Sequence, residues 1–228
     1  MSVLARWAES RLEYTFEDPQ LLEQALTHRS ASRSNYERLE FLGDAFLNFT
    51  VAARLYEQCP HYDEGDLSRA RASLVNRSTL AEVAREIDVE QHIIVGEGER
   101  RTGGAQRSSV LADVFEAVVG AILLDGGHKA ARKFILTLFD TRIADLPLPD
   151  ELKDAKTRLQ EWLQGRGRGL PLYRVESTTG KDHERVFSVR CELADAPRQS
   201  VGEGRSRRSA EQSSAAAMLR DLTSGVEG

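Results

Sequence analysis

The sequence predicts an all-α N-terminal domain over residues 1–146 and a small α+β domain over residues 154–224, joined by a linker at 147–153. Three observations support this division. From Pro19 to about Leu138, apolar residues recur at helical spacing, with polar loops between the segments. After the linker, strand-like alternation lies between two helical segments. The linker itself carries paired prolines, which interrupt helices and strands alike.

The N-terminal domain begins with short elements. The run from Leu21 to Leu26 is amphipathic and predicts a first helix. Thr79 and Glu82 have the spacing of a capping box, which predicts the start of a helix that runs to Ile87. The polar, glycine-rich stretch from Gly96 to Arg107 predicts a long loop.

Two apolar helical segments carry acidic stripes. In the first, Glu37, Glu40 and Asp44 fall within about a sixth of the helix circumference at ~100° per residue. The apolar residues expected on the opposite side are Leu39, Leu42, Phe46 and Phe49.

In the second segment, Asp113 and Glu116 share one face, with Gly120 one turn further along it. The sequence Asp125-Gly126-Gly127 predicts the end of this helix. The apolar residues expected on the opposite side are Val114, Phe115, Val118 and Ile122.

Carboxylates among so many apolar neighbours need a partner, because removing an anion from water costs several kcal/mol. If the two acidic faces pack together, the natural partner is a hard divalent cation, since oxygen-only ligands favour Mg²⁺, Mn²⁺ or Ca²⁺ over zinc. The alternative is that each stripe is a solvated helix face. Neither stripe is offset by local lysines, which favours the metal–carboxylate interpretation.

The C-terminal domain is predicted to follow the order α-β-β-β-α, with a helix pair over one face of an antiparallel sheet. The clearest strand is Arg185 to Leu193, where Phe187, Val189 and Cys191 alternate with polar residues. The other predicted elements are a helix over Ala155–Gln164, a strand around Tyr173 and Val175, a short strand over Gln199–Gly202 and a final helix over Arg207–Leu222.

Charge and composition limit the function classes. The formal net charge is −5, but residues 1–153 carry −7 and residues 154–228 carry +2, so only the second part suits phosphate. Neither a signal peptide nor a membrane span is expected. Cys59 and Cys191 are isolated and match no metal spacing, which suits the reducing cytoplasm. Two Gly-Glu-Gly strings lack the rest of a dinucleotide fingerprint, so no organic cofactor is expected.

Long strings in the chain resemble the ribonuclease III family and follow the family's order. In the first domain these strings are Asn35–Asp44, Asp63–Arg71 and Leu111–Ala117. The second domain is similar to a double-stranded-RNA-binding domain in Lys156–Glu161, Gly180–His183 and Gly202–Glu211. The resemblance covers nearly the whole chain and is to the short bacterial type rather than to Dicer.

This resemblance implies an endoribonuclease that hydrolyses phosphodiester bonds of double-stranded RNA. Glu40, Asp44, Asp113 and Glu116 would bind Mg²⁺, with Mn²⁺ as a plausible substitute, and Asp44 and Glu116 are expected to be the least replaceable. Glu37 and Glu64 would support these ligands or face the RNA; alternatively they are solvated surface residues. The products would have 5′-phosphate and 3′-hydroxyl ends with short 3′ overhangs, and the implied roles are in ribosomal RNA precursor processing and mRNA processing or decay.

The resemblance also implies a homodimer. Phe41 lies beside the acidic stripe, where a monomer would leave the ring exposed, and the family's residue at this position inserts into the partner subunit. The residues that would contact RNA in the second domain are Gln160, Gln164, His183, Arg207 and Arg208. Arg100, Arg101 and Arg107 are weaker candidates in the first domain.

Two other function classes fit parts of the pattern. A double-stranded-RNA-binding regulator with a decayed nuclease domain would retain the second domain, but the presence of all four carboxylates argues against decay. A helical di-iron carboxylate protein would need two Glu-x-x-His pairs, and the sequence contains none.

Overall fold

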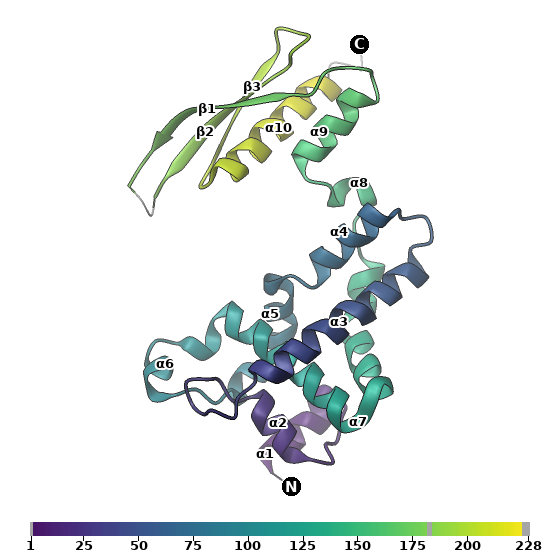
Figure 1. The fold of residues 1–228 in the computed structure, drawn as a ribbon, viewed down its shortest axis with the longest axis vertical. Coiled ribbons are helices and arrows are strands. Elements are labelled where there is room, and N and C mark those ends of the chain that lie inside the picture. The colour runs from purple at the N-terminus through teal and green to yellow at the C-terminus, as the bar shows by residue number, and fades with distance from the viewer. Residues whose placement is uncertain (1, 182–183, 225–228) are drawn as a thin grey trace. The chain divides into compact units, whose positions relative to one another are not determined.

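The computed structural model describes residues 2–181 and 184–224. The chain divides into two compact units, Met1–Pro147 and Leu148–Gly228. The first unit is helical, and in the second unit two helices lie against one sheet (Figure 1). The predicted fold class, an all-α domain followed by a small α-β-β-β-α domain, is confirmed.

The first unit is built around two long helices, α3 (Glu37–Gln58) and α7 (Ser108–Ala144). Shorter helices surround this pair: α1 (Val3–Trp7), a π-helical turn at Ala8–Leu12, α2 (Pro19–Ala25), α4 (Glu64–Leu74), α5 (Arg77–Glu86), a 3₁₀ turn at Val89–His92, α6 (Glu97–Arg101) and a 3₁₀ turn at Gly104–Gln106.

Two glycines allow α3 and α7 to approach to backbone contact. A Cβ atom on Gly43 would lie 1.8 Å from the carbonyl oxygen of Glu116, and one on Gly120 would lie 2.2 Å from that of Leu39. Real Cβ atoms do not come so close to backbone atoms, so glycine is required at both positions for this crossing.

The crossing also decides which side of α3 is buried. The predicted apolar side is wrong in part, since Phe49 is 69% exposed and Phe46 is only half-buried. The buried side instead runs through Leu39, Gly43 and Leu47. Apolar residues occur nearly all around this helix, so their periodicity alone does not select a face. On α7 the predicted apolar residues Val114, Phe115, Val118 and Ile122 are all fully buried.

Three local predictions about where helices begin and end can be compared with the structure. Gly127 has φ 72° and ψ −176° and interrupts α7, as its sequence predicted, but a helix resumes after it and continues to Ala144. The capping-box prediction was wrong, because Asn76 caps α5 by accepting hydrogen bonds from the backbone N–H groups of Ser78 and Thr79, both 3.0 Å long. The stretch predicted as a long loop before α7 contains α6 and a 3₁₀ turn.

The second unit comprises α8 (Pro149–Leu152), α9 (Ala155–Gln164), β1 (Leu172–Thr179), β2 (Val186–Glu192), β3 (Gln199–Gly204) and α10 (Arg207–Ser224). Its sheet is antiparallel with the order β1-β2-β3. Helices α9 and α10 pack on one face of this sheet, around a core formed by Leu159, Leu163, Cys191 and Met218.

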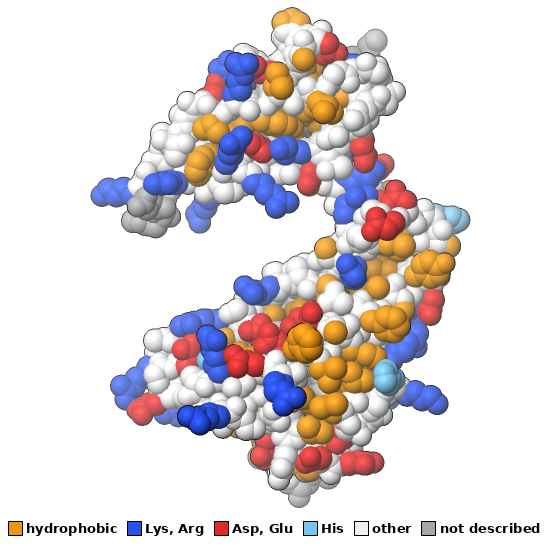
Figure 2. All heavy atoms as spheres, in the orientation of Figure 1, with side chains coloured by type: hydrophobic (Ala, Val, Ile, Leu, Met, Phe, Trp, Pro, Cys, Tyr) orange, Lys and Arg blue, Asp and Glu red, His pale blue; other side chains and the backbone are white. Residues whose placement is uncertain are grey.

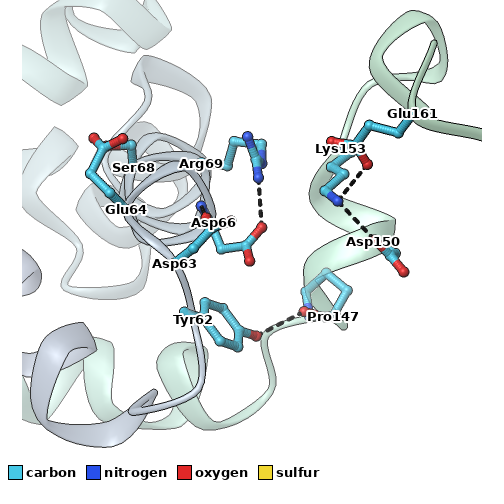
Figure 3. Close-up of polar contacts among 10 residues, drawn as sticks. All are labelled: Tyr62, Asp63, Glu64, Asp66, Ser68, Arg69, Pro147, Asp150, Lys153 and Glu161. Atoms are coloured by element: carbon cyan, nitrogen blue, oxygen red, sulfur yellow. Dashed lines mark hydrogen bonds and ion pairs between the residues drawn. The ribbon is translucent and has the colours of Figure 1, made fainter. Parts of the chain in front are cut away.

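The stretch predicted as linker is not entirely extended. Pro149 stands at the first position of α8, where its missing N–H is not needed. Lys153, just after α8, donates hydrogen bonds to Asp150 (3.0 Å) and Glu161 (2.6 Å) and so ties α8 to α9 (Figure 3). None of the helices in the described part of the chain has the length and apolar content needed to cross a membrane.

Candidate active site and nucleic-acid interface

Three of the predicted metal-ligating residues come together where α3 crosses α7. One carboxylate oxygen from each of Glu40, Asp113 and Glu116 lies within 4.8 Å of the others. Glu40 stands one turn before Gly43 on α3, and Glu116 one turn before Gly120 on α7, so the glycine contact sets the spacing of the cluster. All three side chains are half-buried.

Burial raises the pKa values of all three carboxyl groups, and like charges add to this effect for Glu40 and Glu116. Burial raises the pKa of Glu116 to about 8, and the charges of its three acidic neighbours act in the same direction. Burial and the nearest carboxylates raise the pKa of Glu40 to about 7. The pKa of Asp113 is also raised by burial, although Arg77 and the Tyr36 hydroxyl partly oppose this. The carboxyl groups of this site are therefore more stable when they are protonated or bound to a metal cation than when they are ionised and unpaired.

Asp44, the fourth predicted ligand, lies at the rim of the cluster. Its charge contributes to the raised pKa of Glu116, but its side chain is exposed and stands outside the group of three. The Asn48 side chain donates to the Asp44 carboxylate at 2.7 Å and to the Asp44 carbonyl at 3.0 Å. Asp44 is thus held on its own helix beside the cluster.

The two supporting acids lie further out. Glu37 is exposed and pairs with Arg29 at 3.5 Å. Glu64, at the start of α4, accepts a hydrogen bond from the Ser68 hydroxyl at 2.9 Å (Figure 3). Neither belongs to the group of three carboxylates.

Tyr36 and Arg77 take part in the site but were missed from sequence. Tyr36 is 4% exposed and directly precedes α3, and its hydroxyl lies close enough to Asp113 to lower the pKa of that carboxyl group. Arg77 is the first residue of α5, and its positive charge lowers the pKa of both Asp113 and Glu116. Arg85, eight residues later, reaches Ser108 at the start of α7. No sequence pattern could relate Arg77 to residues so far along the chain.

A hydrophobic surface adjoins the acidic cluster. The ring of Phe41 is 80% exposed, as expected for a monomer, and Leu124 is 57% exposed. Phe41, Leu42 and Leu124 line one shallow hollow. Figure 2 shows acidic side chains gathered beside exposed apolar ones on the visible face of this unit.

The predicted RNA-contacting residues of the second unit are on its surface where the structure describes them. Gln160 and Gln164 are exposed on α9, and Arg207 and Arg208 are exposed in the first turn of α10. His183 lies outside the described residues. Of the weaker candidates in the first unit, Arg101 pairs with Glu97, Arg107 pairs with Glu99, and Arg100 is exposed.

Acidic residues near the start of α10 offset the positive charges of Arg207 and Arg208. Cations at a helix N-terminus oppose the helix dipole. Arg207 pairs with Glu211 one turn later at 2.9 Å. The pKa of Asp154, at the start of α9, is lowered mainly by the hydrogen bond from the Thr157 backbone, and the charge of Arg208 adds to this effect. The backbone N–H of Ser209 donates to the Ser206 hydroxyl at 3.1 Å, which caps the helix.

Comparison with known proteins identifies both units. A family model described as ribonuclease-III-like matches residues 18–142, and one described as the double-stranded RNA binding motif matches residues 155–222. The chain belongs to the ribonuclease III family. It is an endoribonuclease with a double-stranded-RNA-binding domain, and the resemblance seen in the sequence is confirmed.

Individual relatives agree with this assignment. Ribonuclease 3 of Nitrosococcus oceani is 51% identical over 211 residues, which cover 92% of this chain and 91% of the relative. Ribonuclease 3 of Methylococcus capsulatus is 50% identical, with 93% of each chain covered. The crystal structure of the nuclease domain of ribonuclease III from Campylobacter jejuni matches with a TM-score of 0.60 and 38% identity, covering 64% of this chain and 100% of that domain.

The raised pKa values predict how stability depends on pH. A carboxyl group with a higher pKa in the folded state stabilises the fold at low pH, and this stability is lost as pH rises through the folded pKa. Without metal, the melting temperature of the first unit should therefore fall between about pH 5 and about pH 8. Differential scanning calorimetry in a chelator measures this. Glu116→Gln should flatten the decline, whereas Glu23→Gln, at an exposed position on α2, should not; a steep decline that persists in Glu116→Gln would contradict the assignment.

Proposed function

We propose that this ribonuclease III family member is a Mg²⁺-dependent endoribonuclease that cuts both strands of an RNA duplex as a homodimer. It would leave 5′-phosphate and 3′-hydroxyl ends with short 3′ overhangs. The observation that carries the proposal is the group of three carboxylates, Glu40, Asp113 and Glu116, within 4.8 Å of one another. We further propose that it acts in the cytoplasm on ribosomal RNA precursors and mRNA.

The donor set fits a hard divalent cation. It consists of carboxylate oxygens from two helices, half-buried and repelling one another, an arrangement that a cation would relieve. Mg²⁺ suits such ligands, and Mn²⁺ is a plausible substitute. When bound, the cation would activate water and offset the negative charge that develops on the scissile phosphate. Asp44 stands close enough to the group for its charge to raise the pKa of Glu116, which supports a role for it as a fourth ligand.

The surrounding residues support this chemistry. The hydroxyl of Tyr36, beside the carboxylate of Asp113, would help to orient it. Burial raises the pKa of Glu116 to about 8, so this group would bind a proton near neutral pH until a cation replaces it. In the metal-free protein the remaining negative charge of this site repels phosphates, so placing the duplex in the site for cleavage would depend on the metal, whereas binding by the second unit would not. Glu37 and Glu64 are proposed to lie on the RNA side of the site.

The second unit is proposed to bind the duplex by its shape. Arg207 and Arg208 would face phosphates across the narrow major groove of A-form RNA, while Gln160, Gln164 and His183 would reach the adjacent minor grooves. Such contacts read the helical form and the 2′-hydroxyl groups more than the base sequence. The positive net charge of residues 154–228 supports this division of labour.

The proposed dimer interface contains Phe41. A two-fold interface places the same surface on both subunits, so a protruding ring needs a hollow beside it to receive the partner's ring. The exposed ring of Phe41 and the hollow that it lines with Leu42 and Leu124 meet this requirement. A second structure of the Campylobacter jejuni nuclease domain is 40% identical, with a TM-score of 0.58 over 59% of this chain and 95% of that one. That domain shows structural flexibility in a region involved in its dimer formation, which supports an interface of this kind.

Glu116→Gln should separate binding from cutting. The change removes one charge from the metal site and nearly preserves shape, while the second unit is untouched. Affinity for a long RNA duplex should persist, whereas cleavage in Mg²⁺ should fall by a factor on the order of a thousand or more. Gel sizing of the products, with and without Mg²⁺, measures the loss, and Glu82→Gln on α5 serves as control. Near-normal cleavage by Glu116→Gln would remove this residue from the catalytic set, and absence of cleavage by wild type would support a binding protein instead.

Phe41→Ala should weaken the dimer. If each ring fills a pocket in the partner, the change leaves two symmetric cavities at a cost of ~3–5 kcal/mol each. Sedimentation velocity over a range of concentrations should show dissociation at higher protein concentration than for wild type. Leu170→Ala, an equally simple truncation at an exposed position in the second unit, should have no effect. An unchanged dimer constant in Phe41→Ala would show that this residue is outside the interface.

A further inference from the structure

Glu211 lies between two cations at the start of α10. Its Oε1 atom accepts a hydrogen bond from Nε of Arg207 at 2.9 Å, and its Oε2 atom accepts one from Nζ of Lys156 on α9 at 2.7 Å. The Glu211 side chain is only 12% exposed, whereas that of Arg207 is 65% exposed. One half-buried carboxylate therefore joins the two helices and sets the spacing of two basic side chains.

The way Arg207 is held leaves its phosphate-binding groups available. A guanidinium group carries five N–H donors, and Glu211 engages only the one on Nε. The two terminal nitrogens, which form the fork that binds a phosphate with two parallel hydrogen bonds, are not used by this contact. Glu211 thus fixes the direction of the Arg207 side chain without occupying the end that would bind RNA.

Lys156 is held from further sides. Its backbone N–H donates to the side chain of Gln212 at 3.1 Å, and its Nζ atom lies 4.4 Å from the centre of the Tyr173 ring. Since an ammonium group has three donors, donors remain beyond the one given to Glu211. Both ion pairs lower the pKa of Glu211, so it stays charged at neutral pH.

The part of the fold that carries these side chains is held by close contacts between backbone atoms. A Cβ atom on Gly202 would lie 2.1 Å from the backbone nitrogen of Ser214, and one on Gly204 would lie 2.6 Å from that of Ala210. Strand β3 and the first turns of α10 are therefore in direct backbone contact. Because Glu211 lies on this closely packed part of α10, it can hold its two partners in defined positions.

We infer that Glu211 is a positioning residue for binding of duplex RNA, holding Lys156 and Arg207 in place to receive backbone phosphates. By electrostatics alone, a carboxylate on a surface that binds a polyanion weakens binding. The Glu211 carboxylate can nevertheless favour binding, because long basic side chains lose much rotamer freedom when they bind RNA. Here Lys156 and Arg207 have already lost that freedom in the free protein, so binding costs less entropy. The inference rests on the proposed role of the α10 N-terminus in RNA binding.

The sign of one substitution tests this inference. Glu211→Gln removes a negative charge, so electrostatics alone would strengthen binding. Positioning predicts the opposite, a loss of affinity of about fivefold to tenfold for duplexes of unrelated sequence. Binding is measured with the full chain in chelator, and KM for cleavage in Mg²⁺ should rise by a similar factor while kcat is unchanged. The matched control is Glu203→Gln, which removes the same charge from an exposed position on β3 and should not weaken binding.

A second measurement separates positioning from a purely structural role. In a background with Lys156→Gln and Arg207→Gln, Glu211 has no cation left to position, so adding Glu211→Gln should no longer weaken binding. Wild-type or stronger affinity of the single Glu211→Gln variant would overturn the inference, and so would an equal loss in the background that lacks both cations. If the Lys156→Gln, Arg207→Gln background itself binds like wild type, the proposed RNA-binding surface at α10 fails as well.

Discussion

The backbone contact between α3 and α7 is the constraint on which the first unit depends. Gly43 and Gly120 lie where the two helices cross, and neither position has room for a Cβ atom. Because Glu40 and Glu116 each stand one turn before their glycine, the depth of this contact determines how far apart their carboxylates lie. A pair of larger residues would separate the helices and leave two unrelated acidic stripes.

This arrangement is unfavourable for the metal-free protein. Burial and mutual repulsion raise the pKa of Glu40 to about 7 and that of Glu116 to about 8, and the nearby charges of Arg29 and Arg77 offset the repulsion only in part. The buried apolar residues of α3 and α7 hold the carboxylates together against this repulsion. The second unit uses a carboxylate in the opposite way, since Glu211 is stabilised by the two cations that it joins.

The sequence supported both domains and much of the site, because the relevant signals are local. The α9 helix spans Ala155–Gln164, as its amphipathic pattern predicted, and the acidic stripes were visible from helical spacing. Features that depend on tertiary packing could not be predicted from the sequence. The exposure of Phe49 followed from the crossing at Gly43, and the contact of Tyr36 with Asp113 joins residues far apart in the chain. The pairing of Lys156 with Glu211 likewise required the two helices to be placed side by side.

The most direct test of the account is the metal affinity of a protein in which the helix crossing is altered. Isothermal titration calorimetry with Mn²⁺ should compare wild type with Gly43→Ala and with Gly98→Ala, since a Cβ atom on Gly98 would meet nothing within 4 Å. The account predicts that Gly43→Ala weakens binding by about tenfold or more, because the carboxylates move apart, and that Gly98→Ala binds like wild type. A folded Gly43→Ala protein with wild-type metal affinity would contradict it.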